Sequence, residues 1–201
     1  MCGFVVTTDI HNTELMLKKQ KFRGPDAQAF YKDKYIGMGH ALLDINGEKQ
    51  IQPYKTKNGN YIVFNGEMYD TTIPNDTEYL ANGLETYGTD FLVHNDWHGS
   101  LVWYKPKQKE VFMVRDHFGA KPLWLYQKGS QFTATTSLRS ILSGEPSNKH
   151  NKLYQINALM EGDECHIKDV TKIAPGQYIT INLENKTIVK GNLWNGFLVE
   201  K

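Results

Sequence analysis

The chain has 201 residues, of which 40% are hydrophobic and 12% aromatic, enough for one large domain with a sizeable core. Its 23 Lys and Arg against 22 Asp and Glu give a net charge of +1, so charge indicates neither a nucleic-acid nor a membrane partner. No apolar run approaches the roughly 20 residues of a membrane helix, and no signal-peptide pattern is present. Cys2 and Cys165 are too few for a disulfide framework and lack metal-ligand spacing, so we expect a reducing cytoplasm and no metal site.

The first half of the chain is predicted to contain strands and one short helix. Runs of β-branched and aromatic residues favour strands, and polar stretches with Gly and Pro favour loops. The predicted elements are a strand over 2–8, a helix over 12–20, a hairpin of strands 27–33 and 35–43, a loop over 46–59 and a buried strand over 61–64. Asn65-Gly66 follows directly and, taken alone, predicts a tight turn.

The second half adds a longer helix and several strands. Asn75-Asp76-Thr77-Glu78 has the pattern of a helix start, and apolar residues then recur at helical spacing up to Gly88. The further elements are a short helix over 89–94, strands 99–104, 111–116, 123–126 and 131–135, a helical turn over 137–143 and a closing hairpin of 179–183 and 187–189. Residues 144–172 carry no clear signal. Without repeats or linkers, we expect residues 1–201 to form a single mixed domain.

Cys2 is the first candidate functional residue. If Met1 is removed, which a small second residue permits, Cys2 carries both a thiol and a free α-amino group. The amine titrates at about 7.7 to 8.0 and the thiol at about 8.5, so near neutral pH the amine can take the thiol proton. The alternative is that Cys2 is merely a small buried residue. We expect Cys165 to be a structural thiol.

Five stretches follow Met1-Cys2-Gly3, namely Arg23-Gly24-Pro25-Asp26, Phe64-Asn65-Gly66-Glu67-Met68-Tyr69, Asp76-Thr77-Glu78, residues 115–123 and Ala174-Pro175-Gly176-Gln177-Tyr178. Together they resemble the glutamine-hydrolysing domain of the asparagine synthetase family, class II glutamine amidotransferases of the N-terminal nucleophile hydrolase superfamily. They match the family's RGPD turn, FNGEIY segment, D-x-E helix start, RDxxGxKPL hairpin and PPGxY turn. One such match arises readily by chance, whereas five in the family's order are specific.

The resemblance implies an α+β fold, a four-layer αββα sandwich in which the Cys begins a central strand. In that family the thiolate attacks the side-chain amide of glutamine, ammonia leaves and water hydrolyses the thioester, without a cofactor. By similarity, Cys2 is the nucleophile, and the Asn65 side chain with the Gly66 N–H stabilises the oxyanion. Asp76, helped by Glu67, binds the substrate's α-ammonium, and Arg23 holds the Cys2 amine or the nearby backbone.

Two stretches depart from the family pattern. His40-Ala41-Leu42-Leu43-Asp44-Ile45 replaces H-x-R-L-S-I, whose Arg grips the glutamine carboxylate, so Leu42 stands where the Arg is expected. A carboxylate left without its partner in a closed pocket costs roughly 2 to 5 kcal/mol. Three consequences are open from the sequence. Another Lys or Arg reaches the same place, the substrate lacks a free α-carboxylate, or the site binds glutamine poorly. Thr136-Ser137-Leu138-Arg139 replaces Ser-Glu-x-Lys, and there we expect Ser137 to preserve the backbone hydrogen bonding.

Three functions follow from these observations. The first is a glutaminase subunit that delivers ammonia to a separate synthetase or other acceptor-activating protein, since the sequence lacks an SGGxDS-type loop. The second is an amidohydrolase for another linear amide, motivated by Leu42. The third is a non-catalytic relative that acts as an interaction or regulatory subunit. Glutamine is the expected ligand of the first, with neither nucleic acid nor membrane as partner.

Overall fold

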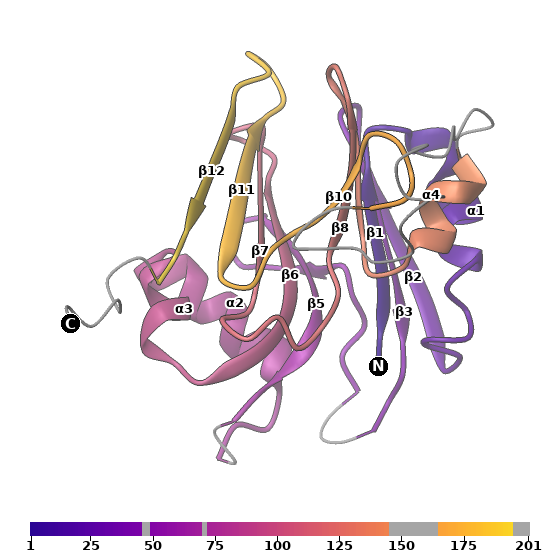
Figure 1. Ribbon diagram of the computed structural model, residues 1–201. Helices are drawn as coiled ribbons and strands as arrows, with labels where there is room; N and C mark the ends of the chain where they lie inside the picture. The colour runs from indigo at the N-terminus through magenta and orange to yellow at the C-terminus, as the bar shows by residue number, and fades with distance from the viewer. Residues whose placement is uncertain (46–48, 70–71, 145–164, 195–201) are drawn as a thin grey trace.

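The protein is described by a computed structural model over residues 1–45, 49–69, 72–144 and 165–194, and its strands form two antiparallel sheets (Figure 1). The first sheet has the order β10-β8-β9-β1-β3-β2 and the second the order β12-β11-β7-β6-β5-β4. The first comprises β1 (Gly3–Thr7), β2 (Ala27–Lys32), β3 (Gly37–Leu42), β8 (Trp124–Lys128), β9 (Gln131–Thr135) and β10 (Val170–Lys172). The second comprises β4 (Tyr54–Lys55), β5 (Tyr61–Met68), β6 (Trp97–Lys105), β7 (Glu110–Arg115), β11 (Gln177–Asn182) and β12 (Ile188–Asn192).

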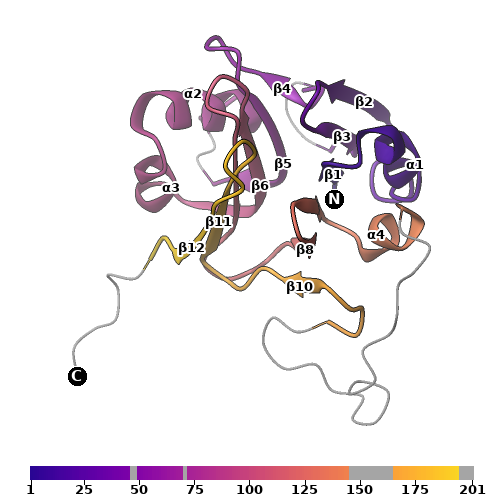
Figure 2. The same ribbon diagram turned by 90° about the horizontal axis from the view of Figure 1, so that it is seen from above.

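Helices cover the outer face of each sheet. The short helix η1 (Ile10–Asn12) leads into α1 (Thr13–Lys18), which lies with α4 (Leu138–Gly144) on the first sheet. On the second sheet lie α2 (Asp76–Tyr87) and α3 (Asp90–His94). Figure 1 shows the resulting order of helices, sheet, sheet and helices, and Figure 2 shows the same layers from above. The predicted four-layer αββα sandwich is therefore confirmed. None of the described helices is long and apolar enough to cross a membrane.

The alternation of side chains along each strand separates the core into layers. In β1, Phe4 and Val6 lie in the core between the two sheets, whereas Val5 packs with Met16 and Leu17 of α1. Because both faces of such strands are covered, their sequences are apolar without interruption, which is what the strand predictions depended on.

The longer helix begins and ends where the sequence indicated. The Asn75 side chain accepts a hydrogen bond from the Glu78 N–H at 2.9 Å, as an N-cap does. Gly88 follows the helix with φ of +63°, a conformation that favours glycine. Leu80 and Leu84 are buried toward the second sheet, in agreement with the predicted apolar spacing.

The remaining predicted strands and helices are also present, with ends that differ by a few residues. The short strands β4 and β10 were not predicted, and residues 145–164 of the unassigned stretch lie outside the described residues. The prediction of a tight turn at Asn65-Gly66 is wrong. Strand β5 continues through it to Met68, because Asn65 pairs with Ser100 and Gly66 pairs with Gly99 of β6.

Candidate active site

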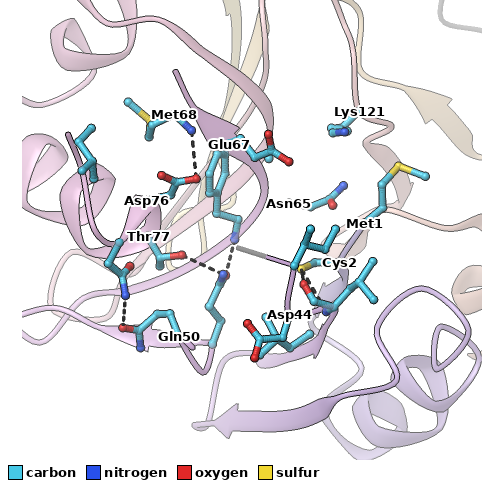
Figure 3. Close-up of a pocket in the computed structure, with 18 of the residues that line it drawn as sticks. Met1, Cys2, Asp44, Gln50, Asn65, Glu67, Met68, Asp76, Thr77 and Lys121 are labelled. Atoms are coloured by element: carbon cyan, nitrogen blue, oxygen red, sulfur yellow. Dashed lines mark hydrogen bonds between the residues drawn. The ribbon is translucent and has the colours of Figure 1, made fainter. Parts of the chain in front are cut away.

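A cavity of about 540 Å³ opens where the N-terminus, the ends of β3 and β5 and the start of α2 meet (Figure 3). It brings together five of the six predicted site residues, namely Cys2, Asn65, Gly66, Glu67 and Asp76. The sixth, Arg23, is not among the described residues that line the cavity. Segments that are far apart in the sequence therefore line one cavity together with the first two residues of the chain.

Arg23 contacts the backbone of the candidate nucleophile. Its Nε donates a hydrogen bond to the carbonyl oxygen of Cys2 at 3.0 Å. The next residue, Gly24, lies against β3 so closely that a Cβ atom there would be 2.1 Å from the carbonyl oxygen of Ala41. This close approach explains the glycine of the turn and lets Arg23 reach the start of β1.

The Cys2 thiol is half-buried and accepts a hydrogen bond from the Leu43 N–H at 3.5 Å. Burial raises the pKa of the thiol, while the Leu43 N–H, the N-terminal ammonium and Arg23 act in the opposite direction. A raised pKa leaves little thiolate at neutral pH, so attack by the sulfur requires a base. No carboxylate or imidazole of the described residues forms a hydrogen bond to the sulfur. Met1 is attached in this structure, so residue 2 gains a free α-amine only when Met1 is removed.

The edge of β5 presents one backbone donor to the cavity. Because odd-numbered residues of β5 bond to β6, the N–H groups of Phe64, Gly66 and Met68 point to the opposite edge. The side chain of Gln52 accepts the first at 2.6 Å, and Asp76 accepts the third at 3.2 Å. The Gly66 N–H lies between these two on the same edge and, by the same alternation, points away from β6. It is therefore a fixed candidate donor on the cavity side of the strand.

The Asn65 side chain is a second candidate donor. The residue is 1% exposed and lines the cavity. Its Nδ2 is buried and has no hydrogen-bond partner among the described residues. Because an unpartnered buried amide is costly, its natural partner is an acceptor that enters the cavity.

Two carboxylates give one side of the cavity an anionic character. Asp76 lies in the first turn of α2, and Glu67 is exposed on β5. Burial raises the pKa of Asp76, the hydrogen bond from the Met68 N–H lowers it, and the neighbouring Glu67 raises it. Such a pair favours a ligand that carries an ammonium group. Within the described ranges, no group of three or more His, Cys, Asp or Glu is arranged to hold a metal ion.

Gln52 is a supporting residue that no motif in the sequence marks. Its Oε1 accepts the Phe64 N–H, and its Nε2 donates to the hydroxyl of Thr77 at 3.1 Å. These bonds tie the start of α2 to the edge of β5. The residue falls in the segment predicted as an irregular loop, where no local pattern marks a buried side chain.

Arg115 and Asp116 fold the loop that places Lys121 at the cavity. The Asp116 carboxylate accepts hydrogen bonds from the N–H groups of Gly99 at 2.9 Å and Ala120 at 3.0 Å. The Arg115 Nε donates to the carbonyl oxygen of Lys121 at 2.7 Å. Lys121 lines the cavity, although the sequence analysis treated it only as part of the matched hairpin.

Leu42 forms part of the cavity wall at the end of β3 and is 7% exposed. Asp26 holds this end of the strand, since its N–H donates to the Leu42 carbonyl at 3.0 Å and its carboxylate accepts the Asp44 N–H at 2.8 Å. The position where the resemblance leads one to expect a cation is therefore an apolar surface in a well-held strand.

At the second departure from the family pattern, Thr136 rather than Ser137 bonds to the neighbouring strand. The Thr136 hydroxyl accepts the Phe4 N–H at 3.1 Å and donates to the Gln20 side chain at 2.7 Å. The expectation that Ser137 preserves the backbone hydrogen bonding is thus wrong in detail, because the adjacent threonine does so.

His40 joins the two sheets close to the cavity. It lies on β3, is 1% exposed, and its Nε2 is buried without a hydrogen-bond partner among the described residues. Burial lowers the pKa of His40 to about 4, and the nearby backbone of Phe64 on β5 opposes this only in part. The ring is therefore neutral at physiological pH.

Folding should depend on pH through His40. Between its ordinary pKa of 6.5 and its folded pKa of about 4, the unfolded chain binds a proton that the folded chain excludes. The His40 contribution to the free energy of unfolding is thus fully present above pH 6.5 and falls by about 3 kcal/mol as the pH drops to about 4. We expect the free energy of unfolding in urea, measured at several pH values, to change less with pH in His40→Gln than in wild type. In the exposed His94→Gln variant it should change with pH as in wild type. The same pH dependence in all three proteins would contradict this role of His40.

Comparisons with known proteins identify the family of this chain. The family model described as "Glutamine amidotransferase domain" matches residues 1–194. A putative asparagine synthetase [glutamine-hydrolyzing] 2 of Methanocaldococcus jannaschii is 26% identical, over 89% of this chain and 42% of its own length. The amidase chry2 of Gibberella zeae is 23% identical, over 85% of this chain and 28% of its own length. The chain thus spans less than half the length of these curated relatives.

A solved structure extends the likeness to the fold. Glutamine phosphoribosylpyrophosphate (PRPP) amidotransferase from Bacillus subtilis, complexed with ADP and GMP, superposes with a TM-score of 0.69 at 13% identity, covering 96% of this chain and 49% of that chain. At this identity the likeness concerns the fold alone. Taken with the family match over residues 1–194, it follows that the chain belongs to the glutamine amidotransferase domain family.

Proposed function

We propose that this chain hydrolyses the side-chain amide of glutamine, with Cys2 as the nucleophile, and supplies the ammonia to an acceptor-activating enzyme. The observation that carries the proposal is the cavity itself, which Cys2, Asn65 and Gly66 line together and in which Asn65 has an unpartnered side-chain Nδ2. A thiol opposite two fixed donors suits attack on a carbonyl carbon, because negative charge develops on the carbonyl oxygen.

The first half of the reaction would transfer the acyl group to sulfur. Once Met1 is removed, the Cys2 α-amine takes the thiol proton, and the sulfur attacks the amide carbon of glutamine. The C=O electron pair moves to oxygen, where Asn65 Nδ2 and the Gly66 N–H donate to it. When the carbonyl re-forms, the C–N bond breaks and the protonated amine gives its proton to the leaving ammonia. A γ-glutamyl thioester on Cys2 results.

The second half would release glutamate. Water attacks the thioester carbon while the Cys2 α-amine accepts a proton from it, and the same two donors stabilise the second oxyanion. The C–S bond then breaks, and the sulfur recovers a proton from the amine. One residue thus serves both as nucleophile and as general base.

The other predicted residues would position the reactants. Asp76 and Glu67 would bind the substrate's α-ammonium, consistent with the anionic side of the cavity. Arg23 would hold the carbonyl of Cys2 and so orient the nucleophile, acting through the backbone and not on the substrate. We further propose that residues 1–201 form one domain, because both sheets contribute to the cavity.

The direct test is ammonia release from glutamine by protein with a free Cys2 N-terminus. We expect glutamate and ammonia in equal amounts, and no reaction from the same chain carrying an uncleaved N-terminal extension, since that form lacks the α-amine. Hydrolysis at the same rate by both forms would contradict the proposed base, and failure of both would contradict the function.

A second candidate function is hydrolysis of a linear amide that lacks a free α-carboxylate. Leu42 favours it, since this wall of the cavity offers no charge to a carboxylate. The fungal relative named as an amidase supports the same reading. Faster hydrolysis of such an amide than of glutamine would select this candidate.

The setting of the reaction is also a proposal. The name of the archaeal relative couples glutamine hydrolysis to asparagine synthesis, so a synthetase-type protein is the kind of acceptor enzyme we expect as partner. A nucleophilic thiol must stay reduced, which fits a cytoplasmic location.

A further inference from the structure

We propose that the Lys121 ammonium binds the α-carboxylate of the substrate, an inference that rests on the proposed function. Glutamine carries one positive and one negative group on the same carbon, three bonds from the amide carbon. A site that holds the amide at Cys2 must therefore also accommodate a carboxylate nearby, and an anion needs a cation or several donors as its partner.

The charges on the cavity wall leave one candidate for this partner. The charged side chains among its described lining residues are Asp44, Glu67, Asp76 and Lys121. The three carboxylates repel a second anion, whereas Lys121 is the one Lys or Arg in that set. The Arg23 guanidinium is directed to the Cys2 backbone and does not line the cavity.

Lys121 is held in place by its backbone while its ammonium has no partner. The loop bonds from Arg115 and Asp116 fix the peptide groups around it. Within the described part of the chain, no ion pair or side-chain hydrogen bond involves its Nζ. Since Lys121 is only half-buried, its flexible stem can place a compact charge over a range of positions in the cavity.

The location of Lys121 also fits an anion. Figure 3 shows it on the side of Asn65 and Glu67, with Asp44 at the opposite side. A carboxylate at Lys121 would lie on the side away from Asp44, and the ammonium on the same substrate carbon would remain free to meet Asp76 and Glu67. The cation that the Leu42 wall does not supply would thus come from another element, the loop that follows β7.

Steady-state kinetics on two substrates tests the proposal. Glutamine has the carboxylate, and its α-methyl ester keeps the side-chain amide and the ammonium but is neutral at that position. For Lys121→Gln we expect the KM for glutamine to rise about 10-fold or more, as for the loss of one charged partner, with kcat little changed. The KM for the ester should be unaffected, and Lys121→Arg should retain most of the affinity for glutamine.

Lys49→Gln is the matched control, because Lys49 is an exposed lysine beside the cavity-lining Gln50 but does not itself line the cavity. It should leave the KM for both substrates unchanged.

Three results would overturn the inference while leaving glutamine hydrolysis intact: an equal rise in KM for glutamine and ester in Lys121→Gln, an unchanged KM for glutamine, or a larger effect of Lys49→Gln. Wild-type protein that hydrolyses the ester but not glutamine would overturn it too. Inactivity of wild type on both substrates would instead contradict the proposed function.

Discussion

Cys2→Ala should lower the rate of ammonia release from glutamine by about 10⁴-fold or more, because no other group can form the thioester. The groups proposed to bind the substrate, Asp76, Glu67 and Lys121, would remain, so the variant should still bind glutamine. A fixed-time assay of ammonia with protein whose Met1 has been removed measures the loss, and binding of glutamine by calorimetry shows that the site is intact.

The matched control is Cys165→Ala, since Cys165 is the other cysteine and is buried in a separate apolar cluster with Tyr126 and Ile141. We expect it to keep nearly full activity, with at most a modest loss of stability. If Cys2→Ala retained activity within a few fold of wild type, the nucleophile would have to be sought elsewhere.

Asn65→Ala should reduce kcat by about 10² to 10³-fold with little change in KM, which is the loss typical of one oxyanion donor. The reason is the unpartnered Nδ2 of Asn65, a residue that lines the same cavity as Gly66 and Cys2. Because the donor meets full charge only in the transition state, its removal should affect the chemical step more than substrate binding.

Two comparisons separate this effect from a loss of fold. Asn82→Ala changes an exposed asparagine on α2 and should leave the kinetics unchanged. Thermal unfolding of Asn65→Ala shows whether the buried site tolerates the smaller side chain. A folded Asn65→Ala protein with wild-type kcat would show that Asn65 does not stabilise the oxyanion.

The layers of the fold could be predicted because their signals are local. Uninterrupted apolar runs such as 61–64 mark strands that are covered on both sides, and the Asn75 cap marks the start of α2. The short strand β4 has no such signal, since its two residues are in a strand only through their pairing with β5.

The candidate site likewise contains residues that local motifs indicate and residues that they do not. Cys2, Asn65 and Asp76 were identified because matched motifs carry them, yet Asn65-Gly66 alone indicated a turn. Only the pairing with β6 shows that the Gly66 N–H points to the opposite edge of β5, and that a Cβ there would lie 2.0 Å from the His98 carbonyl oxygen.

Gln52 and Lys121 could not have been predicted, since their contribution depends on contacts through space. Gln52 bonds to a strand and a helix that follow it in the chain. Lys121 reaches the cavity through a loop that a buried arginine and aspartate fold. Neither the contacts of Gln52 nor the loop that positions Lys121 produces a recognisable pattern in the sequence near the residue.

The central claim is that the sulfur of residue 2 attacks the glutamine amide carbon. A glutamine analogue with a diazoketone in place of the amide would be attacked at the same position and would remain attached. Peptide mass spectrometry of the Met-cleaved protein after complete inactivation should find one analogue per chain, on Cys2, and none when glutamine is present in excess. Inactivation with Cys2 unmodified, or attachment at another residue, would contradict the account.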